Sequence, residues 1–316
     1  MNNNKLLFGE KYFQEVRTAT FRKEEYSYIH TGIIDEYGEM WTTTEMDEAN
    51  IFQVYNQYRL KHGIPFPDEI SAIREHYGLS AAKMAQILGF GINQYRMYED
   101  GEVPSVSNAR TIIAAREKDV FMSFVEASKS EMSEQEYLRI KKKAEAANGD
   151  YKPIVQPSEY TGFRSLSTDK IANVVRLIIS TIGSTFVTKM NKLLFYADFI
   201  HYKNHGFGIT GITYKALPFG PVPVRWGTLY SSLSGIDMEE YVYPSGQSGI
   251  KLEATENTDN ILNESEISTI EKVCSLFSNM SAGEISQTSH LEKGWIDNKD
   301  ARSPISYQDA FALNYD

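Results

Sequence analysis

Residues 73–101 read IREHYGLSAAKMAQILGFGINQYRMYEDG, and this stretch decides the fold of the middle of the chain. Ser80 is a typical helix-capping residue, and the apolar spacing after it predicts a short helix that ends at Gly89. A second helix is predicted to run from Ile92 to about Tyr98, with Tyr95 and Tyr98 on one face. We therefore expect these two aromatic side chains to anchor the second helix to the core.

The same residues, followed by Glu99-x-Gly101 and Pro104-Ser105, resemble the DNA-binding domain of the XRE (Cro/repressor-like) family. The resemblance implies that the second helix is a recognition helix, with Asn93, Gln94 and Arg96 facing base edges. The cations expected to meet phosphates are Lys83, Arg96, Arg110 and Arg116. The alternative is a helix-turn-helix that serves dimerisation or protein contact, and the acidic balance of the segment gives weight to it.

A second group of motifs lies in the C-terminal half. The chain reads KMNKLLFYADF at 189–199, then GITYKA at 211–216, FGPVP at 219–223 and SHLEKGW at 289–295. By residue type these motifs predict a helix core face, a loop stiffened by two prolines, and a tryptophan anchor. In this order they are similar to the Panacea domain, also called SocA-like, of bacterial and phage antitoxins. The resemblance implies that this half binds and neutralises a toxin protein, and it identifies no toxin-contacting residue.

The N-terminal region shows a third, partial resemblance. Strands are predicted within residues 21–44 and a helix over residues 47–62. A strand-rich piece and a helix ahead of an XRE domain resemble the MqsA/YgiT-type antitoxins, which carry a zinc site of paired Cys-x-x-Cys motifs. Residues 1–63 contain no cysteine. We therefore expect no zinc there, and apolar packing in its place.

The best domain boundary follows the helix-turn-helix region, where Asn148-Gly149-Asp150, Pro153 and Pro157 interrupt all periodicity. The predicted fold class is multidomain, mainly α with α+β parts. The predicted parts are a small strand-plus-helix region (1–63), an all-α helix-turn-helix domain with following helices (64–147), a linker (148–160) and a helix-dominated α+β toxin-neutralising domain (161–316).

Composition limits the possible classes of function. The 32 basic and 42 acidic residues give a net charge of −10, which excludes a globally basic nucleic-acid binder but not a local basic surface. The single cysteine, Cys274, excludes an internal disulfide framework and a Cys-only zinc site. No apolar run approaches the length of a membrane span. We expect a cytoplasmic protein with no membrane partner.

Few residues suggest catalysis or metal binding. His201 and His205 are four apart and can share a helix face, but no third ligand has useful spacing. Ser289 and His290 are adjacent, so on a helix they point in different directions, and no orienting acid is identifiable. Cys274 is expected to be a small buried hydrophobe. We therefore expect no enzyme activity, no metal and no cofactor.

The sequence favours an antitoxin of a type II toxin–antitoxin system. The expected partners are a cognate toxin, operator DNA through which the chain represses its own operon, and a second copy of the chain in a homodimer. The alternative is a helix-turn-helix transcriptional regulator whose C-terminal domain senses a ligand or partner, with no toxin.

Overall fold

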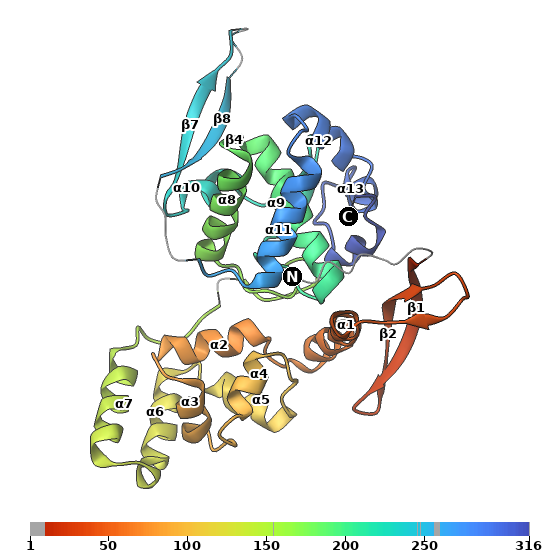
Figure 1. Cartoon of the computed structure of the whole chain (residues 1–316). Coiled ribbons are helices and arrows are strands. Elements are labelled where there is room, and N and C mark those ends of the chain that lie inside the picture. Colours follow the sequence, from red (N-terminus) through yellow and green to blue (C-terminus); the bar gives the residue numbers. More distant parts are fainter. Residues whose placement is uncertain (1–9, 154, 245, 247, 256–259, 316) are drawn as a thin grey trace. The chain divides into compact units, whose positions relative to one another are not determined.

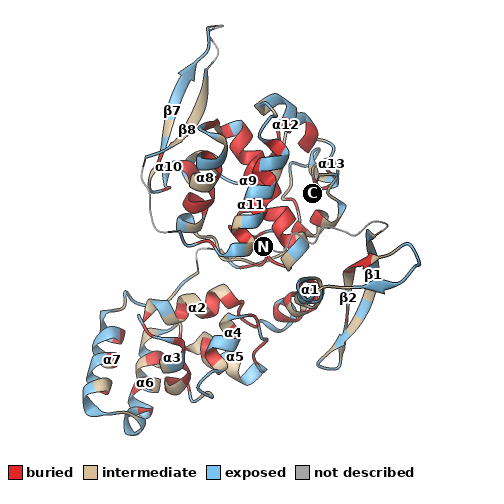
Figure 2. Ribbon diagram, in the orientation of Figure 1, coloured by how far each residue is buried: buried red, intermediate tan, exposed pale blue. Residues whose placement is uncertain are grey.

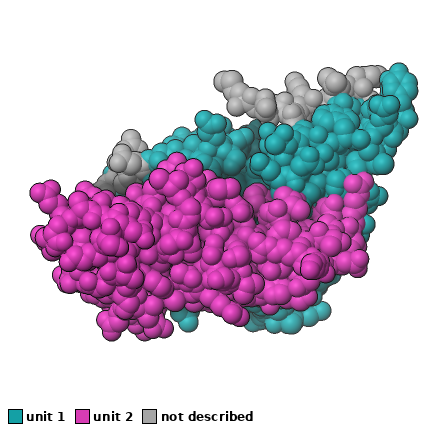
Figure 3. Space-filling model, turned by 90° about the horizontal axis from the view of Figure 1, so that it is seen from below, with its two compact units in different colours: residues 1–16, 29–50, 157–316 teal, residues 17–28, 51–156 magenta. Residues whose placement is uncertain are grey.

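The computed structural model describes residues 10–153, 155–244, 246, 248–255 and 260–315. Its helices and small sheets confirm the predicted class, mainly α with α+β parts (Figure 1). The chain divides into two compact units, coloured separately in Figure 3. Unit 1 comprises residues 1–16, 29–50 and 157–316, and unit 2 comprises residues 17–28 and 51–156. Residues 1–9 of the predicted N-terminal region lie outside the described residues.

The N-terminal region is a hairpin followed by a long helix. Its elements are β1 (Lys11–Phe21), β2 (Glu24–Ile34), β3 (Met40–Trp41) and α1 (Thr44–His62), and the strand order is β1-β2-β3. In unit 2, the Phe21 ring packs on Tyr55 and Tyr58 of α1, with ring centroids 4.7 and 5.1 Å away. The sequence-based expectation placed strands only within residues 21–44. It missed most of β1 because that strand is largely exposed and lacks apolar alternation.

Unit 2 also contains the helical domain. Its helices are α2 (Pro67–His76), α3 (Ala81–Ile87), α4 (Gln94–Glu99), α5 (Val106–Ala114), α6 (Lys118–Ala127), the 3-10 turn η1 (Lys129–Glu131) and α7 (Glu134–Ala146). Tyr77 stacks on Phe121 at 3.8 Å and donates a hydrogen bond to the Ala115 carbonyl. Figure 2 shows the buried faces of these helices turned inward. Buried side chains of α3 and α4 belong to the same hydrophobic core as those of α2, α6 and α7, and this core holds α3 and α4 in position.

The predicted linker is partly built into unit 2. The Tyr151 amide donates to the Arg116 carbonyl at 2.8 Å, and the Asp150 carboxylate accepts from the Lys118 amide at 3.1 Å. The division between the units falls after Gln156. The start of the predicted linker therefore packs on the helical domain, since its backbone groups find partners there.

Unit 1 is organised around one helix, α9 (Val187–His205). Every residue of α9 from 189 to 202 is buried, because other elements pack on it from several sides. Its neighbours include α8 (Thr168–Ile182), α11 (Glu264–Phe277), α12 (Ala282–Ser289), β6 (Gly220–Pro223) and η2 (Tyr307–Ala312). Cys274 on α11 is buried as expected, and burial raises the pKa of its thiol to about 11.

Two small sheets complete unit 1. The first has the order β4-β8-β7, from β4 (Thr185–Phe186), β7 (Ile236–Val242) and β8 (Ser248–Ala254); the second pairs β5 (Tyr214–Leu217) with β6. The remaining helices are α10 (Trp226–Ser231) and α13 (Lys293–Asn298). The Gly-Pro-Val-Pro segment was expected to be a loop, but it is strand β6. Pro221 and Pro223 flank Val222, so the two residues that lack an N–H group stand at alternate positions along the β5–β6 strand pair.

The ends of the helices agree with the capping residues in the sequence. Ser281 and Glu284 form a capping box at the start of α12, with each side chain bonded to the backbone of the other. The Ser133 hydroxyl accepts from the Glu136 amide at the start of α7. In the described part of the chain, no helix combines the length and the apolar character needed to cross a membrane.

Candidate functional site

The first candidate site is the surface made by α3 and α4. Ser80 caps α3 by accepting from the Lys83 amide, and Gly89 turns the chain with a φ of 69°. The Tyr95 hydroxyl donates to the Ile70 carbonyl at 2.8 Å. The Tyr98 hydroxyl oxygen accepts from the side-chain amide of Asn108 at 2.8 Å. Both rings are buried, which confirms that they anchor α4 to the core.

The structure brings three of the predicted DNA-contacting residues together. Asn93 is the N-cap of α4, and Gln94 and Arg96 lie in its first turn. Asn93 and Arg96 are exposed, while Gln94 is half-buried. Side chains at this end of a recognition helix are the ones that can reach base edges.

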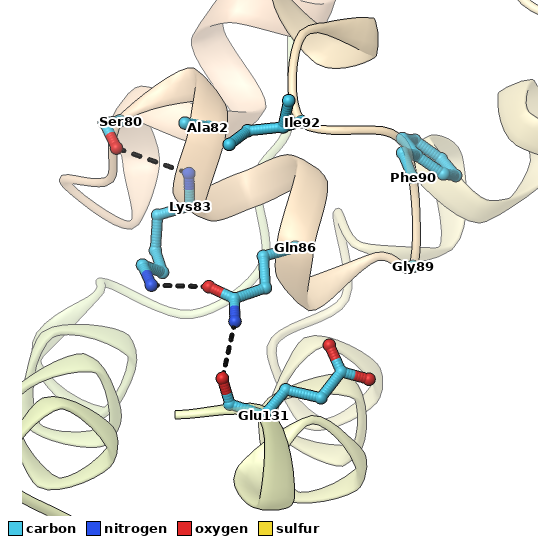
Figure 4. A pocket seen from close by; sticks show the side chains of 8 residues that line it. All are labelled: Ser80, Ala82, Lys83, Gln86, Gly89, Phe90, Ile92 and Glu131. Atoms are coloured by element: carbon cyan, nitrogen blue, oxygen red, sulfur yellow. Dashed lines mark hydrogen bonds between the residues drawn. The ribbon is translucent and has the colours of Figure 1, made fainter. Parts of the chain in front are cut away.

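Lys83, the fourth predicted contact, is engaged inside the domain. Its ammonium group donates to the Gln86 side chain at 2.5 Å and pairs with the Glu136 carboxylate at 2.6 Å. Gln86 in turn donates to the Glu131 carbonyl at 2.9 Å (Figure 4). These groups line an open pocket of about 600 Å³, bounded by Ser80, Ala82, Lys83, Gln86, Gly89, Phe90, Ile92 and Glu131.

Ion pairs within the domain reduce the charge offered to phosphates. Arg116 pairs with the buried Glu69 carboxylate at 2.8 Å, as Lys83 does with Glu136. Arg96 and Arg110 are exposed and have no ion pair with any described residue. Of the four cations expected at phosphates, these two are available.

Sequence reasoning missed two residues of this surface. Ile92 is 73% exposed just before α4, and Met97 is 48% exposed on α4 itself. Neither fits the buried face set by Tyr95 and Tyr98, and this mismatch was the signal available in the sequence. Exposed apolar side chains on a recognition helix can contact thymine methyl groups.

The second candidate site lies in unit 1, where the C-terminal motifs meet. Asp198 of α9 is fully buried and accepts four hydrogen bonds from the segment after α9. One carboxylate oxygen accepts from the amides of Ile209 and Thr210 at 2.8 and 2.9 Å. The other accepts from the hydroxyls of Thr210 and Tyr214 at 2.5 and 2.6 Å. Burial raises the pKa of Asp198, and the hydroxyl donors oppose that rise.

The turn between β5 and β6 is held by Trp295 of the last motif and by Ser286 of α12. Trp295 donates from its indole nitrogen to the Leu217 carbonyl at 2.8 Å, and the Ser286 hydroxyl donates to the Phe219 carbonyl at 3.2 Å. The His290 ring stacks on Trp295 at 4.0 Å. Hydrogen bonds to the carbonyls of Leu217 and Phe219 therefore hold the turn in place.

Three of the motifs approach one another closely at Gly220. Its φ is +99°, and a Cβ there would lie 2.4 Å from the Ser289 hydroxyl oxygen and 2.6 Å from the Lys192 Cε. Residues far apart in the sequence thus meet at a position that only glycine fits. Spacing along the chain could not show this meeting.

Lys192 is the unusual group of this site. It is fully buried, and its Nζ has no hydrogen-bond partner among the described residues. Burial lowers the pKa of Lys192 to about 8. The neighbouring Lys189 differs, because it donates to the carbonyls of Ser278 and Met280 at 3.0 and 2.6 Å.

The histidines and Ser289 are built into the packing. His201 Nδ1 lies 2.8 Å from the Phe207 carbonyl oxygen, and burial lowers the pKa of His201 well below its usual value. The Ser289 hydroxyl donates to the Ser286 carbonyl at 2.8 Å. Among the residues that the structure describes, no group of three or more His, Cys, Asp or Glu side chains is arranged to hold a metal ion.

Comparison with known proteins yields one match. Residues 190–296 match the family model described as "Antitoxin SocA-like, Panacea domain", which confirms the resemblance seen in the C-terminal motifs. The match covers the meeting points at Asp198 and Gly220 and the hairpin of β7 and β8. No curated protein and no solved structure matches the chain.

Proposed function

We propose that the chain is the antitoxin of a type II toxin–antitoxin system and that it neutralises a cognate toxin by binding it through unit 1. The match of residues 190–296 to an antitoxin domain carries this proposal. The buried Asp198, His201 and Ser289 have hydrogen-bond partners within the fold, which agrees with a scaffold built for binding. We propose that neutralisation is association, with no covalent step.

We further propose that α3 and α4 bind the operator of the chain's own operon, with two copies of the chain on two half-sites. The exposed N-terminal turn of α4 supports this role. With Arg96 and Arg110 as the available cations, one copy makes few phosphate contacts. Specific binding therefore depends on the dimer and falls steeply with salt.

Replacing Arg96 with Ala is expected to weaken binding to the chain's own promoter. A charge-assisted base contact is worth about 1–3 kcal/mol, so the dissociation constant should rise ~5- to 150-fold. Fluorescence anisotropy with a labelled promoter fragment measures the change. Arg139→Ala removes an exposed arginine from α7 and serves as the matched control, with binding within about twofold of wild type. Equal binding by the Asn93→Ala/Gln94→Ala/Arg96→Ala variant and by wild type would refute the assignment.

The same triple variant separates the two proposed activities. It should lose repression of its own promoter and keep neutralisation, because its three positions lie in unit 2 and the antitoxin match lies in unit 1. The adjacent open reading frame is expressed alone, together with the wild-type chain, and together with the variant, and the growth of the three cultures is compared. An adjacent product that does not slow growth, or that wild type fails to neutralise, would remove the antitoxin role and favour the plain regulator.

A further inference from the structure

The hairpin of β7 and β8 exposes large side chains near its end. It projects from the body of unit 1, as Figure 1 shows. Tyr241 and Tyr243 are 46% and 38% exposed. Exposed aromatic clusters of this kind commonly mark interaction sites.

Three aromatic rings form one face of this hairpin. Phe186 of β4 stacks on Tyr243 at 5.6 Å and meets Tyr241 edge-on at 5.8 Å, and the two tyrosines lie 5.0 Å apart. Gly249 stands opposite Tyr241 in the register, and a Cβ there would lie 3.2 Å from the Phe186 ring. The missing side chain leaves room for the rings to meet. We call this face, with the residues that share it, the aromatic face.

The aromatic face also carries an excess of negative charge. Side chains alternate along a strand, so Asp237 and Glu239 lie on the face of Tyr241, opposite Glu253 and Lys251. Lys251 pairs with Glu253 at 3.1 Å. Asp237 and Glu239 are exposed and form no ion pair with another described residue. Three carboxylates thus stand beside one ammonium group.

The buried polar side chains of the C-terminal motifs are poor candidates for partner contact. Lys192, Asp198, Ser289 and Glu292 are all buried to 1% exposure or less. A partner cannot reach these side chains in the folded chain. Recognition therefore has to use exposed elements carried by this scaffold.

We propose that the aromatic face binds the cognate toxin through a toxin segment that carries lysine or arginine side chains. This inference rests on the antitoxin role proposed above. Tyrosine rings attract cations over their faces, and tyrosine and arginine are frequent at the centres of interfaces. The carboxylates complement a basic segment and repel phosphates, which disfavours a nucleic acid or an anionic membrane as the occupant.

The experiment measures binding of full-length chain to the tagged product of the adjacent open reading frame, co-expressed and purified. Tyr241→Ala/Tyr243→Ala should weaken binding at least ~30-fold, and Glu239→Lys about tenfold. The matched controls are Val242→Ala and Glu240→Lys, which change exposed neighbours on the opposite face of the same strand. Thermal melts confirm that each variant is folded, and raising the salt from 50 to 300 mM should weaken binding by wild type more than by Glu239→Lys.

The outcomes separate this inference from the proposal beneath it. If wild type binds and neutralises the toxin while the aromatic-face variants match their controls, the docking face is wrong and the antitoxin role stands. If wild type neither binds nor neutralises the product, both the docking face and the antitoxin role are wrong. Loss of binding by the controls as strongly as by the aromatic-face variants would also overturn the assignment to this face.

Discussion

Replacing Asp198 with Ala is expected to lower the free energy of unfolding of unit 1 by about 4 kcal/mol or more. The change leaves four buried donors, the amides of Ile209 and Thr210 and the hydroxyls of Thr210 and Tyr214, without their acceptor. Each unsatisfied buried donor costs about 1–3 kcal/mol, and partial relaxation reduces the sum. Urea unfolding followed by tryptophan fluorescence measures the loss, because Trp41, Trp226 and Trp295 all lie in unit 1.

Two further variants test the cause. Asp198→Asn keeps one oxygen for the two amides and should lose less stability than Asp198→Ala. Asp300→Ala removes an exposed carboxylate from the same unit and should change stability by no more than about 0.5 kcal/mol. If Asp198→Ala were no less stable than Asp300→Ala, the buried network would not hold the segment after α9 in place.

Replacing Lys192 with Met is expected to stabilise unit 1 near neutral pH by about 3 kcal/mol. The pKa of Lys192 falls from 10.5 to about 8 on folding, which corresponds to about that cost for keeping the ammonium group buried. Between pH 8 and 10.5 the folded state binds fewer protons than the unfolded state, so wild-type stability rises with pH. The advantage of Lys192→Met should therefore shrink through this window, as urea unfolding at several pH values can measure.

Lys189→Met is the matched control for this result. Lys189 lies on the same helix and donates to two carbonyls at the end of α11, so its loss removes both hydrogen bonds and should destabilise the unit. Opposite signs for the two lysines are the expected outcome. A destabilised Lys192→Met variant at pH 7 would show that the Lys192 ammonium group has an acceptor in solution.

Local signals in the sequence predicted the two short helices α3 and α4 and the turn between them. Ser80 caps α3, Gly89 ends it, and Tyr95 and Tyr98 bury the inner face of α4, because caps, turns and helical periodicity act over a few residues. The DNA-contacting roles of Asn93 and Arg96 stay predictions.

The arrangement of the C-terminal site could not be predicted from such signals. Lys189 and Lys192 have the residue type of a solvated helix face, yet α9 is surrounded and both are buried. The meeting of Lys192, Gly220 and Ser289 joins positions that are close only in the folded chain. Periodicity describes one element at a time, so it carries no information about which distant elements cover it.

The rate at which a thiol reagent labels Cys274 can report how often unit 1 opens. The thiolate is the reactive form of cysteine, and burial with a pKa raised to about 11 keeps this thiol inert in the folded chain. A thiol reagent can modify it only during moments when α11 separates from α9. Because unit 2 contains no cysteine, the labelling rate reports the opening of unit 1 alone, and a bound partner that holds this unit closed would slow the rate.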